Sequence, residues 1–419
     1  MKILIISESI NVEDSSASKG RVALINNLNK AGFDLKVLHY SHKEIQLKNI
    51  DCELIKENRF SLLFFLSRTV RILQRITKIY FNSKLEKFFG FSFTHTNDTN
   101  SIAKAINKNQ NFNPDLIFTL SKGGSFRPHR AMLKLPELQS KWMAYIHDPY
   151  PFHVYPRPYN FVEESYKSKE KFMLSITKKA KILSFPSLLL KEWMQSYFPD
   201  VTDKSVIIPH QIKVDDELQP LPDFFQKEQF SLLHAGNLLK QRNPAFLIEA
   251  FLNFLEKNPS SKTEAKLYFI GNYNEHAALL ERYKNHPNVV INGYVEYKII
   301  QTIEKEAAVN IILEAISEIS PFLPGKFPNC IKSNKPMLLV GPYYSEVRRL
   351  LGKEYPYWSE ANDSKTIEEN ITKLYQLWKN NPNEFKLNRN DLGNYCDEVS
   401  LKKVFDVSVK NLLTTNLKQ

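Results

Sequence analysis

Two segments in the second half of the chain combine a glycine turn with basic side chains. The first covers residues 234–244 and the second covers residues 320–342. Each reads as a strand end, a turn, fixed cations and the start of a helix, which together bind diphosphates through backbone N–H groups and cationic side chains. We therefore predict a half-site for a nucleotide-linked ligand. Its glycine and basic residues are Gly236, Lys240, Arg242, Gly325 and Lys326.

Two glutamates precede the second segment. Glu314 ends an apolar run, where a lone carboxylate is costly to bury unless it is paired or used. Glu318 follows four residues later. It fits a contact with the ligand and a position in solvent equally well. Asn329, just after Lys326, offers an amide that could hydrogen-bond a ribose hydroxyl.

The first half has one notable strand end, at His147 and Asp148. A histidine at a cleft can accept or donate a proton near neutral pH. The alternatives are a histidine that bonds its own backbone and a simple turn at Asp148-Pro149. The loop of residues 121–129, with two glycines and flanking basic residues, fits either a substrate loop or a plain flexible turn. Gly20 lies near the start of the first helix, where a phosphate contact is a further hypothesis.

The elements that must position these residues alternate as strand and helix, in two rounds. Short, nearly continuous apolar runs predict parallel strands buried on both faces. Alternation with helical patterns predicts a doubly wound α/β fold in each half, with ligands at the carboxyl ends of the strands. The expected strands are 2–7, 34–40, 115–120, 141–147, 180–185, 205–209, 230–235, 265–270, 288–291, 309–314 and 336–340.

The expected helices include residues 18–31, which stop at Gly32, and residues 244–258, with Pro244 at the first position. Further helical patterns cover 274–284, 296–307 and 326–333. The polar stretch 213–229 is the expected linker. These patterns predict an N-terminal domain over residues 1–212, a C-terminal domain over residues 213–395, and a last helix over residues 396–419 that returns to the N-terminal domain.

On these motifs the chain resembles the GT-B glycosyltransferases, and more narrowly the retaining family 4 of bacterial polysaccharide and lipid glycosyltransferases. The resemblance implies two Rossmann-like domains facing a cleft, with the acceptor on the N-terminal side and the nucleotide sugar on the C-terminal side. It also implies diphosphate contacts from Gly236, Lys240, Arg242 and Lys326. Many relatives carry Pro-Gly-Lys-x-x-Glu at the helix start, whereas this chain has Asn329 where that glutamate stands.

The resemblance further implies that Glu314 and Glu318 correspond to the family's glutamate pair, which faces the sugar and the ribose. His147, with Asp148 beside it, corresponds to a residue that faces the donor sugar or the acceptor. The implied reaction moves a glycosyl group from a nucleoside diphosphate to an acceptor hydroxyl, with retention. Fixed cations replace a bound metal and no cofactor is needed. A double displacement would need a carboxylate near the anomeric carbon, and Glu314 is the candidate.

Bulk composition narrows the class of protein. A chain of 419 residues is expected to form two domains. No apolar run approaches the ~18 residues that span a bilayer. Three dispersed cysteines show neither a disulfide framework nor a metal spacing, which favours a reducing cytoplasm. The net charge of +12 fits either an anionic partner or an ordinary basic surface. No nucleic-acid-binding motif accompanies it, so nucleic acid is not an expected partner.

Half of this net charge lies in residues 56–87, where eight basic residues face two acidic ones. Four of the basic residues fall on one helical face, and apolar residues fall on the opposite face. The pattern fits peripheral binding to an anionic membrane at the inner face of the cytoplasmic membrane, and equally a helix docked on the domain core. The basic face is Arg68, Arg71, Arg75 and Lys78, and the apolar face is Leu66, Val70, Leu73, Ile76 and Tyr80.

The sequence thus favours a glycosyltransferase that builds a surface polysaccharide, a lipopolysaccharide or a glycolipid, with a glycan or lipid-linked acceptor. The alternative is a non-catalytic sugar-nucleotide-binding protein or scaffold on the same fold, which Asn329 supports. A sugar-nucleotide epimerase would need more carboxylates and histidines at the cleft than the sequence shows.

Overall fold

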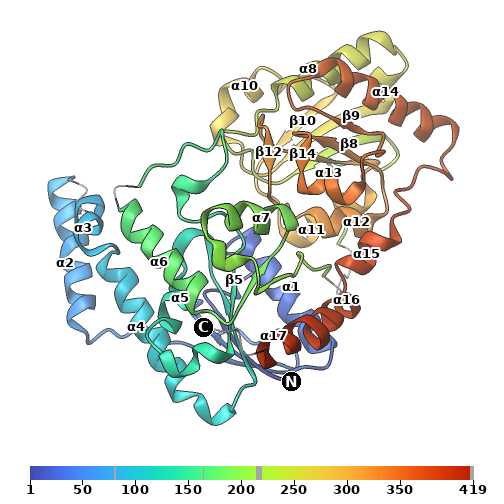
Figure 1. Cartoon of the computed structure of the whole chain (residues 1–419). Coiled ribbons are helices and arrows are strands. Elements are labelled where there is room, and N and C mark those ends of the chain that lie inside the picture. The colour runs from blue at the N-terminus through green and yellow to red at the C-terminus, as the bar shows by residue number, and fades with distance from the viewer. Residues whose placement is uncertain (80–81, 164, 214–218, 416–419) are drawn as a thin grey trace. The chain divides into compact units, whose positions relative to one another are not determined.

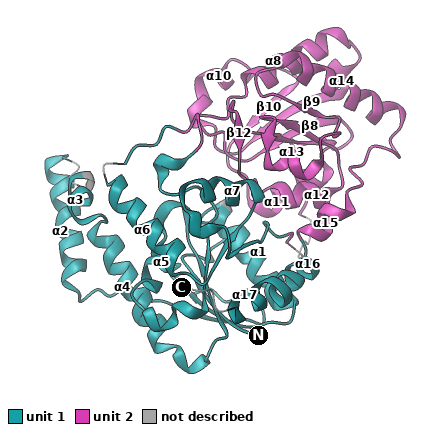
Figure 2. Ribbon diagram, in the orientation of Figure 1, with its two compact units in different colours: residues 1–155, 160–211, 397–419 teal, residues 156–159, 212–396 magenta. Residues whose placement is uncertain are grey.

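The chain forms two compact units in a computed structural model that describes residues 1–79, 82–163, 165–213 and 219–415. Unit 1 contains residues 1–155, 160–211 and 397–419, and unit 2 contains residues 156–159 and 212–396 (Figure 2). Residues 214–218 of the expected linker and residues 416–419 of the last helix lie outside the described residues. Each unit has its own sheet and its own apolar core.

Unit 1 is built on a sheet that includes β5 (Figure 1). Its strands are parallel and lie in the order β3-β2-β1-β4-β5-β6-β7. The chain runs outward from β1 to β3, and then from β4 outward on the other side. The direction of winding therefore reverses between β1 and β4. The strands are β1 (Lys2–Ser7), β2 (Asp34–His39), β3 (Asp51–Leu54), β4 (Leu116–Leu120), β5 (Trp142–Tyr145), β6 (Ile182–Phe185) and β7 (Ser205–Ile207).

Helices cover both faces of this sheet because its strands are apolar on both sides. Ile3 and Ile5 of β1 pack toward one layer, and Leu4 and Ile6 pack toward the other. The described helices before residue 200 are α1 (Ser16–Lys30), α2 (Leu62–Thr77), α3 (Asn82–Phe89), α4 (Phe93–Lys108), α5 (Arg127–Met132), α6 (Tyr166–Lys179) and α7 (Leu188–Tyr197).

The C-terminal segment packs on unit 1, as the sequence predicts. It comprises α16 (Glu398–Lys403), a π-helical stretch (Val404–Val409) and α17 (Lys410–Thr414). Phe405 is fully buried, and its ring lies 5.3 Å from Phe33 and 6.1 Å from Phe118, centroid to centroid. This segment completes the layer that α1 begins.

Unit 2 repeats the scheme, with a sheet in the order β10-β9-β8-β11-β13-β15 and a separate β12-β14 pair. Its strands are β8 (Phe230–Ala235), β9 (Ala265–Ile270), β10 (Val289–Asn292), β11 (Val309–Leu313), β12 (Ile319–Ser320), β13 (Met337–Val340), β14 (Tyr344–Ser345) and β15 (Trp358–Ser359). Its helices are α8 (Ala245–Lys257), α9 (Ser261–Glu264), α10 (Ala277–Glu281), α11 (Tyr297–Glu306), α12 (Phe327–Ser333), α13 (Glu346–Leu351), α14 (Ser364–Asn380) and α15 (Asn390–Tyr395).

Most element boundaries differ from the sequence-based expectations by one to three residues. Pro244 caps α8 instead of opening it, and α12 begins at Phe327, one residue after the expected Lys326. The expected helix 274–284 is a 3₁₀ turn followed by the short α10. No helix of the described part of the chain is both long and apolar enough to cross a membrane.

Candidate functional site

The carboxyl edge of the unit 2 sheet gathers four of the predicted site residues. Winding reverses between β8 and β11, and ligands of doubly wound sheets bind at such a point. The Lys326 ammonium lies there, donating to the Ala235 carbonyl at the end of β8 (3.2 Å) and to the Ile311 carbonyl of β11 (2.6 Å). A fixed cation thus lies across the two strands that flank the reversal.

Desolvation lowers the pKa of Lys326 to about 8, and the positive charge of Arg242 acts in the same direction. The carboxylate of Glu304 opposes both effects. The lysine is therefore mostly charged at neutral pH, in surroundings where that charge is poorly solvated. An anionic ligand would relieve this cost.

Glu314 follows β11 directly and is only 3% exposed. Its Oε1 accepts a hydrogen bond from the Ser320 hydroxyl (2.6 Å), and the Ser345 hydroxyl also acts on this carboxyl group. Burial raises the pKa of Glu314 to about 7, against the opposing effects of the Ser320 hydroxyl and the Arg242 charge. The group therefore titrates near neutral pH, which is typical of carboxyls at functional sites.

Arg242 lies in the loop between β8 and α8, and its charge shifts the pKa of Glu314, of Lys326 and of the buried His234. The same loop begins with Gly236, whose φ of +129° is open to glycine but strained for other residues. The buried Nε of Arg242 has no hydrogen-bond partner among the described residues. Two cations, a glycine turn and a carboxyl group thus meet at one edge of the sheet.

The other predicted residues of unit 2 are less buried than Glu314. Lys240, Glu318 and Gly325 are exposed. Asn329 is half-buried, and its Nδ2 donates to Glu304 Oε2 of α11 at 3.0 Å. The amide nitrogen expected to meet a ribose hydroxyl is therefore directed at a buried carboxylate of the protein.

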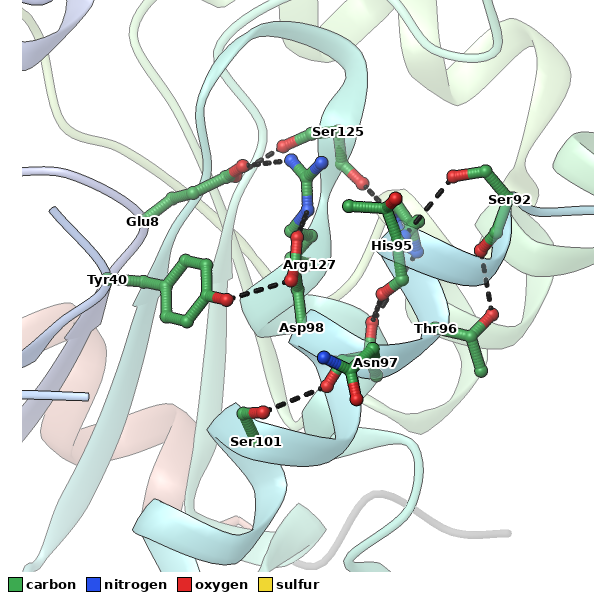
Figure 3. Close-up of polar contacts among 12 residues, drawn as sticks. Glu8, Tyr40, Ser92, His95, Thr96, Asn97, Asp98, Ser101, Ser125 and Arg127 are labelled. Atoms are coloured by element: carbon green, nitrogen blue, oxygen red, sulfur yellow. Dashed lines mark hydrogen bonds and ion pairs between the residues drawn. The ribbon is translucent and has the colours of Figure 1, made fainter. Parts of the chain in front are cut away.

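Unit 1 carries a buried charge network at its own reversal, between β1 and β4 (Figure 3). Glu8 follows β1 and accepts from the Lys122 backbone N–H (2.9 Å), the Ser125 hydroxyl and Arg127 Nη1 (2.5 Å). Arg127 Nε lies 2.9 Å from Asp98. The network ties the end of β1 to the loop after β4 and to α4.

Asp98 and His95, both on α4, continue this network (Figure 3). Tyr40 donates its hydroxyl to Asp98 Oδ1 at 2.8 Å. The His95 Nε2 atom lies 2.6 Å from the Ser125 carbonyl, and Arg130 lies 3.0 Å from His95 Nδ1. Burial holds the pKa of His95 well below its usual value, so the ring is neutral, with its proton on Nε2 facing the carbonyl.

A small pocket of unit 1 brings together two predicted residues, Gly20 and His147. Arg21, Ser121 and His210 also line it. The Arg21 guanidinium donates to the Ser121 carbonyl (2.8 Å), to the Ser9 carbonyl after β1 (2.8 Å) and to the Ser18 hydroxyl of α1 (2.7 Å). The pocket opens at the carboxyl ends of β4 and β5, where a doubly wound sheet presents its ligand sites.

Burial lowers the pKa of His147 to about 3, and the nearby positive charge of Arg21 acts in the same direction. The His147 Nε2 atom lies 3.4 Å from a carboxylate oxygen of Asp148. The ring is therefore neutral at physiological pH. It can donate or accept a hydrogen bond, but a pKa this far below neutral makes it a weak general base.

Comparisons with known proteins agree with this architecture. No protein-family model matches the chain, and no curated protein matches its sequence. Among solved structures, a glycosyltransferase from Rickettsia africae aligns with 99% of each chain at 14% identity and a TM-score of 0.63. The Anabaena protein HepE, in complex with UDP and glucose, aligns over 98% of this chain and 100% of its own at 11% identity and a TM-score of 0.61.

Trehalose-6-phosphate synthase from E. coli, bound with UDP-2-fluoro glucose, aligns over 99% of both chains at 12% identity and a TM-score of 0.60. Its match, like the other two, spans both sheets. The chain has the GT-B fold. The structural likeness establishes the fold of both units, and the sequence-based prediction of this fold is confirmed.

Within this GT-B protein, several buried charged residues escaped the sequence reasoning. Glu8, Asp98 and Arg127 come from segments between 29 and 119 positions apart, so no local spacing relates them. Glu304 lies on an amphipathic helix, where a glutamate ordinarily reads as solvent-facing. The one available signal was the position of Glu8, a carboxylate directly after the first buried strand.

Proposed function

We propose that this protein transfers a glycosyl group from a nucleoside-diphosphate sugar to an acceptor hydroxyl. The observation that carries the proposal is the Lys326 ammonium at the winding reversal of unit 2, with the charge of Arg242 close enough to perturb it. A leaving diphosphate develops negative charge, and preorganised cations at that place stabilise it. These two side chains would do so without a bound metal.

Glu314 is the proposed carboxyl group at the donor sugar. With a pKa of about 7 it is partly protonated at neutral pH, so it can donate to a sugar hydroxyl or act as a carboxylate. Retention of configuration is part of the proposal and follows from the family resemblance. Neutral His147, with Asp148 beside it and Gly20 across the pocket, would bind a hydroxyl on the N-terminal side of the predicted cleft.

Lys240, Glu318 and Gly325 remain candidate substrate contacts, since exposed loops can close on a ligand. The proposed acceptor is a glycan or a lipid-linked glycan in the synthesis of a surface polysaccharide, a lipopolysaccharide or a glycolipid. A lipid-linked acceptor would be met at the inner face of the cytoplasmic membrane. No cofactor takes part in this proposal.

A second function, non-catalytic binding of a sugar nucleotide, is favoured by one observation. Asn329 stands where relatives carry a glutamate, and its amide donates to Glu304. A donor ribose would then have to compete with a charge-assisted hydrogen bond inside the protein. Donor binding without turnover would be the signature of this function.

The test is release of nucleoside diphosphate from a panel of sugar nucleotides, with and without a chelator. We expect slow hydrolysis of one donor, unchanged by the chelator and lost in Lys326→Ala. Lys353→Ala, which removes an exposed lysine of the same unit, is the matched control and should retain the activity. Tight binding of a donor with no release in the wild type would favour the non-catalytic function, and binding of none would contradict both.

A further inference from the structure

Helix α2 (Leu62–Thr77) exposes its apolar side chains instead of burying them. Phe60, just before the helix, is 93% exposed, and Leu62 and Ile76 are each 73% exposed. The exposed apolar residues of this segment are Phe60, Leu62, Phe65, Leu66, Ile72, Leu73, Ile76 and Ile79. Within the helix they recur every three or four positions, so they form one stripe. We call this stripe the α2 apolar face.

The side of α2 that packs on the domain is a different one. The helix contacts α4, and its one buried residue is Ser67, whose hydroxyl donates to the Phe64 carbonyl at 2.7 Å. Half-buried Leu63, Val70 and Gln74 lie on the Ser67 side. An amphipathic helix on a globular core ordinarily buries its apolar stripe. Here the stripe points away from the unit, so packing within unit 1 does not account for it.

A row of basic side chains borders the α2 apolar face. Arg68, Arg71, Arg75 and Lys78 are all exposed, and Arg68 lies over the Phe64 ring at 4.7 Å. Glu57 is the only acidic residue between positions 56 and 79, against six basic ones. Tyr80 of the expected apolar face lies outside the described residues. The helix does pack on unit 1 with its charges in water, as one sequence-based alternative had it, but of the described residues of the expected apolar face only Val70 is half-buried, whereas Leu66, Leu73 and Ile76 are exposed.

We propose that this face binds an anionic lipid bilayer, with α2 lying in the plane of the interface. An apolar stripe flanked by lysine and arginine matches acyl chains beside anionic headgroups. A second copy of this chain fits less well, because pairing two such faces would bring the two basic rows together. The binding does not depend on glycosyl transfer, so it is testable whether or not the proposed function holds.

The experiment is co-sedimentation of the full chain with vesicles of phosphatidylcholine and phosphatidylglycerol in a two-to-one ratio, and with vesicles of phosphatidylcholine alone. We expect binding to the anionic vesicles that weakens with added salt. The double variant Ile72→Gln/Ile76→Gln removes two exposed apolar side chains and should weaken binding at least about tenfold. Arg75→Gln/Lys78→Gln should weaken binding to the anionic vesicles and reduce its dependence on salt.

Val399→Gln/Val407→Gln is the matched control, since both valines are exposed in the C-terminal segment of the same unit. This control should bind as the wild type does, and circular dichroism should show all variants folded. Failure of the wild type to bind anionic vesicles would overturn the proposal. A stable dimer that Ile72→Gln/Ile76→Gln dissociates, with no vesicle binding, would assign the face to a second copy instead.

Discussion

Glu314 and Lys326 are both pushed toward their neutral forms by burial, although their charges are opposite. Glu314 directly follows β11, the Lys326 ammonium reaches the end of β8, and the charge of Arg242 acts on both. Burying such groups lowers the stability of the folded state, but their charge states then respond to the charge of a bound ligand. Their titration offers two direct tests.

The first test concerns the stability contributed by Glu314. Its pKa rises from 4.5 in the unfolded chain to about 7 in the folded one, so the folded state binds the proton more tightly. Stability from this group is complete below pH 4.5 and is lost as the pH rises through 7, by about 3 kcal/mol at most. Glu314→Gln should therefore melt above the wild type at pH 8, and the gap should close near pH 4.5. An equal gap at both pH values, measured by calorimetry, would contradict the assigned shift.

The second test concerns Lys326 and anion binding. Its pKa falls from 10.5 to about 8, so stability from this group rises with pH between these values as the folded state loses its proton first. Diphosphate binding needs the charged form. Pyrophosphate itself also titrates in this range, so its measured affinity is first corrected for its own protonation. The corrected affinity should fall about tenfold between pH 7 and pH 9.

Lys326→Arg provides the control, because arginine stays charged over this range. If the variant binds, its affinity should be flat with pH after the same correction, measured by titration calorimetry. An equally steep fall in the wild type and in Lys326→Arg would show that another group titrates.

At the scale of elements, the β8 and β9 strand ends approach so closely that only glycine fits. A Cβ on Gly271 would lie 2.5 Å from the Gly236 carbonyl oxygen, and Gly271 has a φ of +133°. Gly271→Ala should destabilise the protein by about 2 kcal/mol or more and move the loop that carries Arg242. Gly293→Ala, where a Cβ meets nothing within 4 Å, should change the melting temperature little. Similar denaturation midpoints for the two variants would contradict this account.

The Glu8–Arg127 pair holds together three elements of unit 1. Glu8 is 5% exposed and accepts three donors, so removing Arg127 leaves a buried charge with fewer partners. Arg127→Met should cost about 3 kcal/mol in the free energy of unfolding. Arg59→Met removes an exposed arginine that pairs with the partly buried Glu57 at 3.6 Å and should cost under about 1 kcal/mol. Urea denaturation of both variants measures the two losses in the free energy of unfolding. Equal losses would show that the buried pair stabilises the fold no more than the Arg59–Glu57 pair does.

The strands that the sequence predicts well are those with continuous apolar runs, such as β1, β8 and β9. Strand β3 (Asp51–Leu54) was missed because it is polar and lies at the sheet edge, where Lys36 pairs with Asp51 and Glu53. Strands β12, β14 and β15 are two residues long, too short for any periodicity to show. The sequence-based boundaries were otherwise within a few residues.

The candidate site was predictable where a local motif carries it. Gly236 and Arg242 share one loop, and Lys326 opens a second motif, so their association followed from the strand–turn–helix pattern. The pairing of Asn329 with Glu304, and of Glu8 with Arg127, depends on tertiary contacts that no spacing in one sequence reveals. The position of Glu314 after an apolar run predicts that it is buried. The size of its pKa shift depends on tertiary neighbours and could not be predicted from the sequence.

At the scale of the whole molecule, the two units repeat one architecture with different polar residues at the strand ends. Unit 1 places a self-satisfied network of Glu8, Arg127 and Asp98 at its winding reversal. Unit 2 places two cations and a raised-pKa carboxyl there. We therefore propose that unit 2 binds the anionic part of the ligand. Solved structures share this fold at 10–14% identity, so the fold is compatible with widely different sequences.

The most direct measurement is the melting temperature in the presence of a panel of nucleoside diphosphates and sugar nucleotides, without added metal. A ligand at a hundred times its dissociation constant stabilises the folded state by about 2.7 kcal/mol. We predict a clear rise with at least one nucleotide, lost in Arg242→Ala and retained in Arg282→Ala, which removes an exposed arginine of the same unit. No rise with any nucleotide, or an undiminished rise in Arg242→Ala, would contradict the assignment of the diphosphate site.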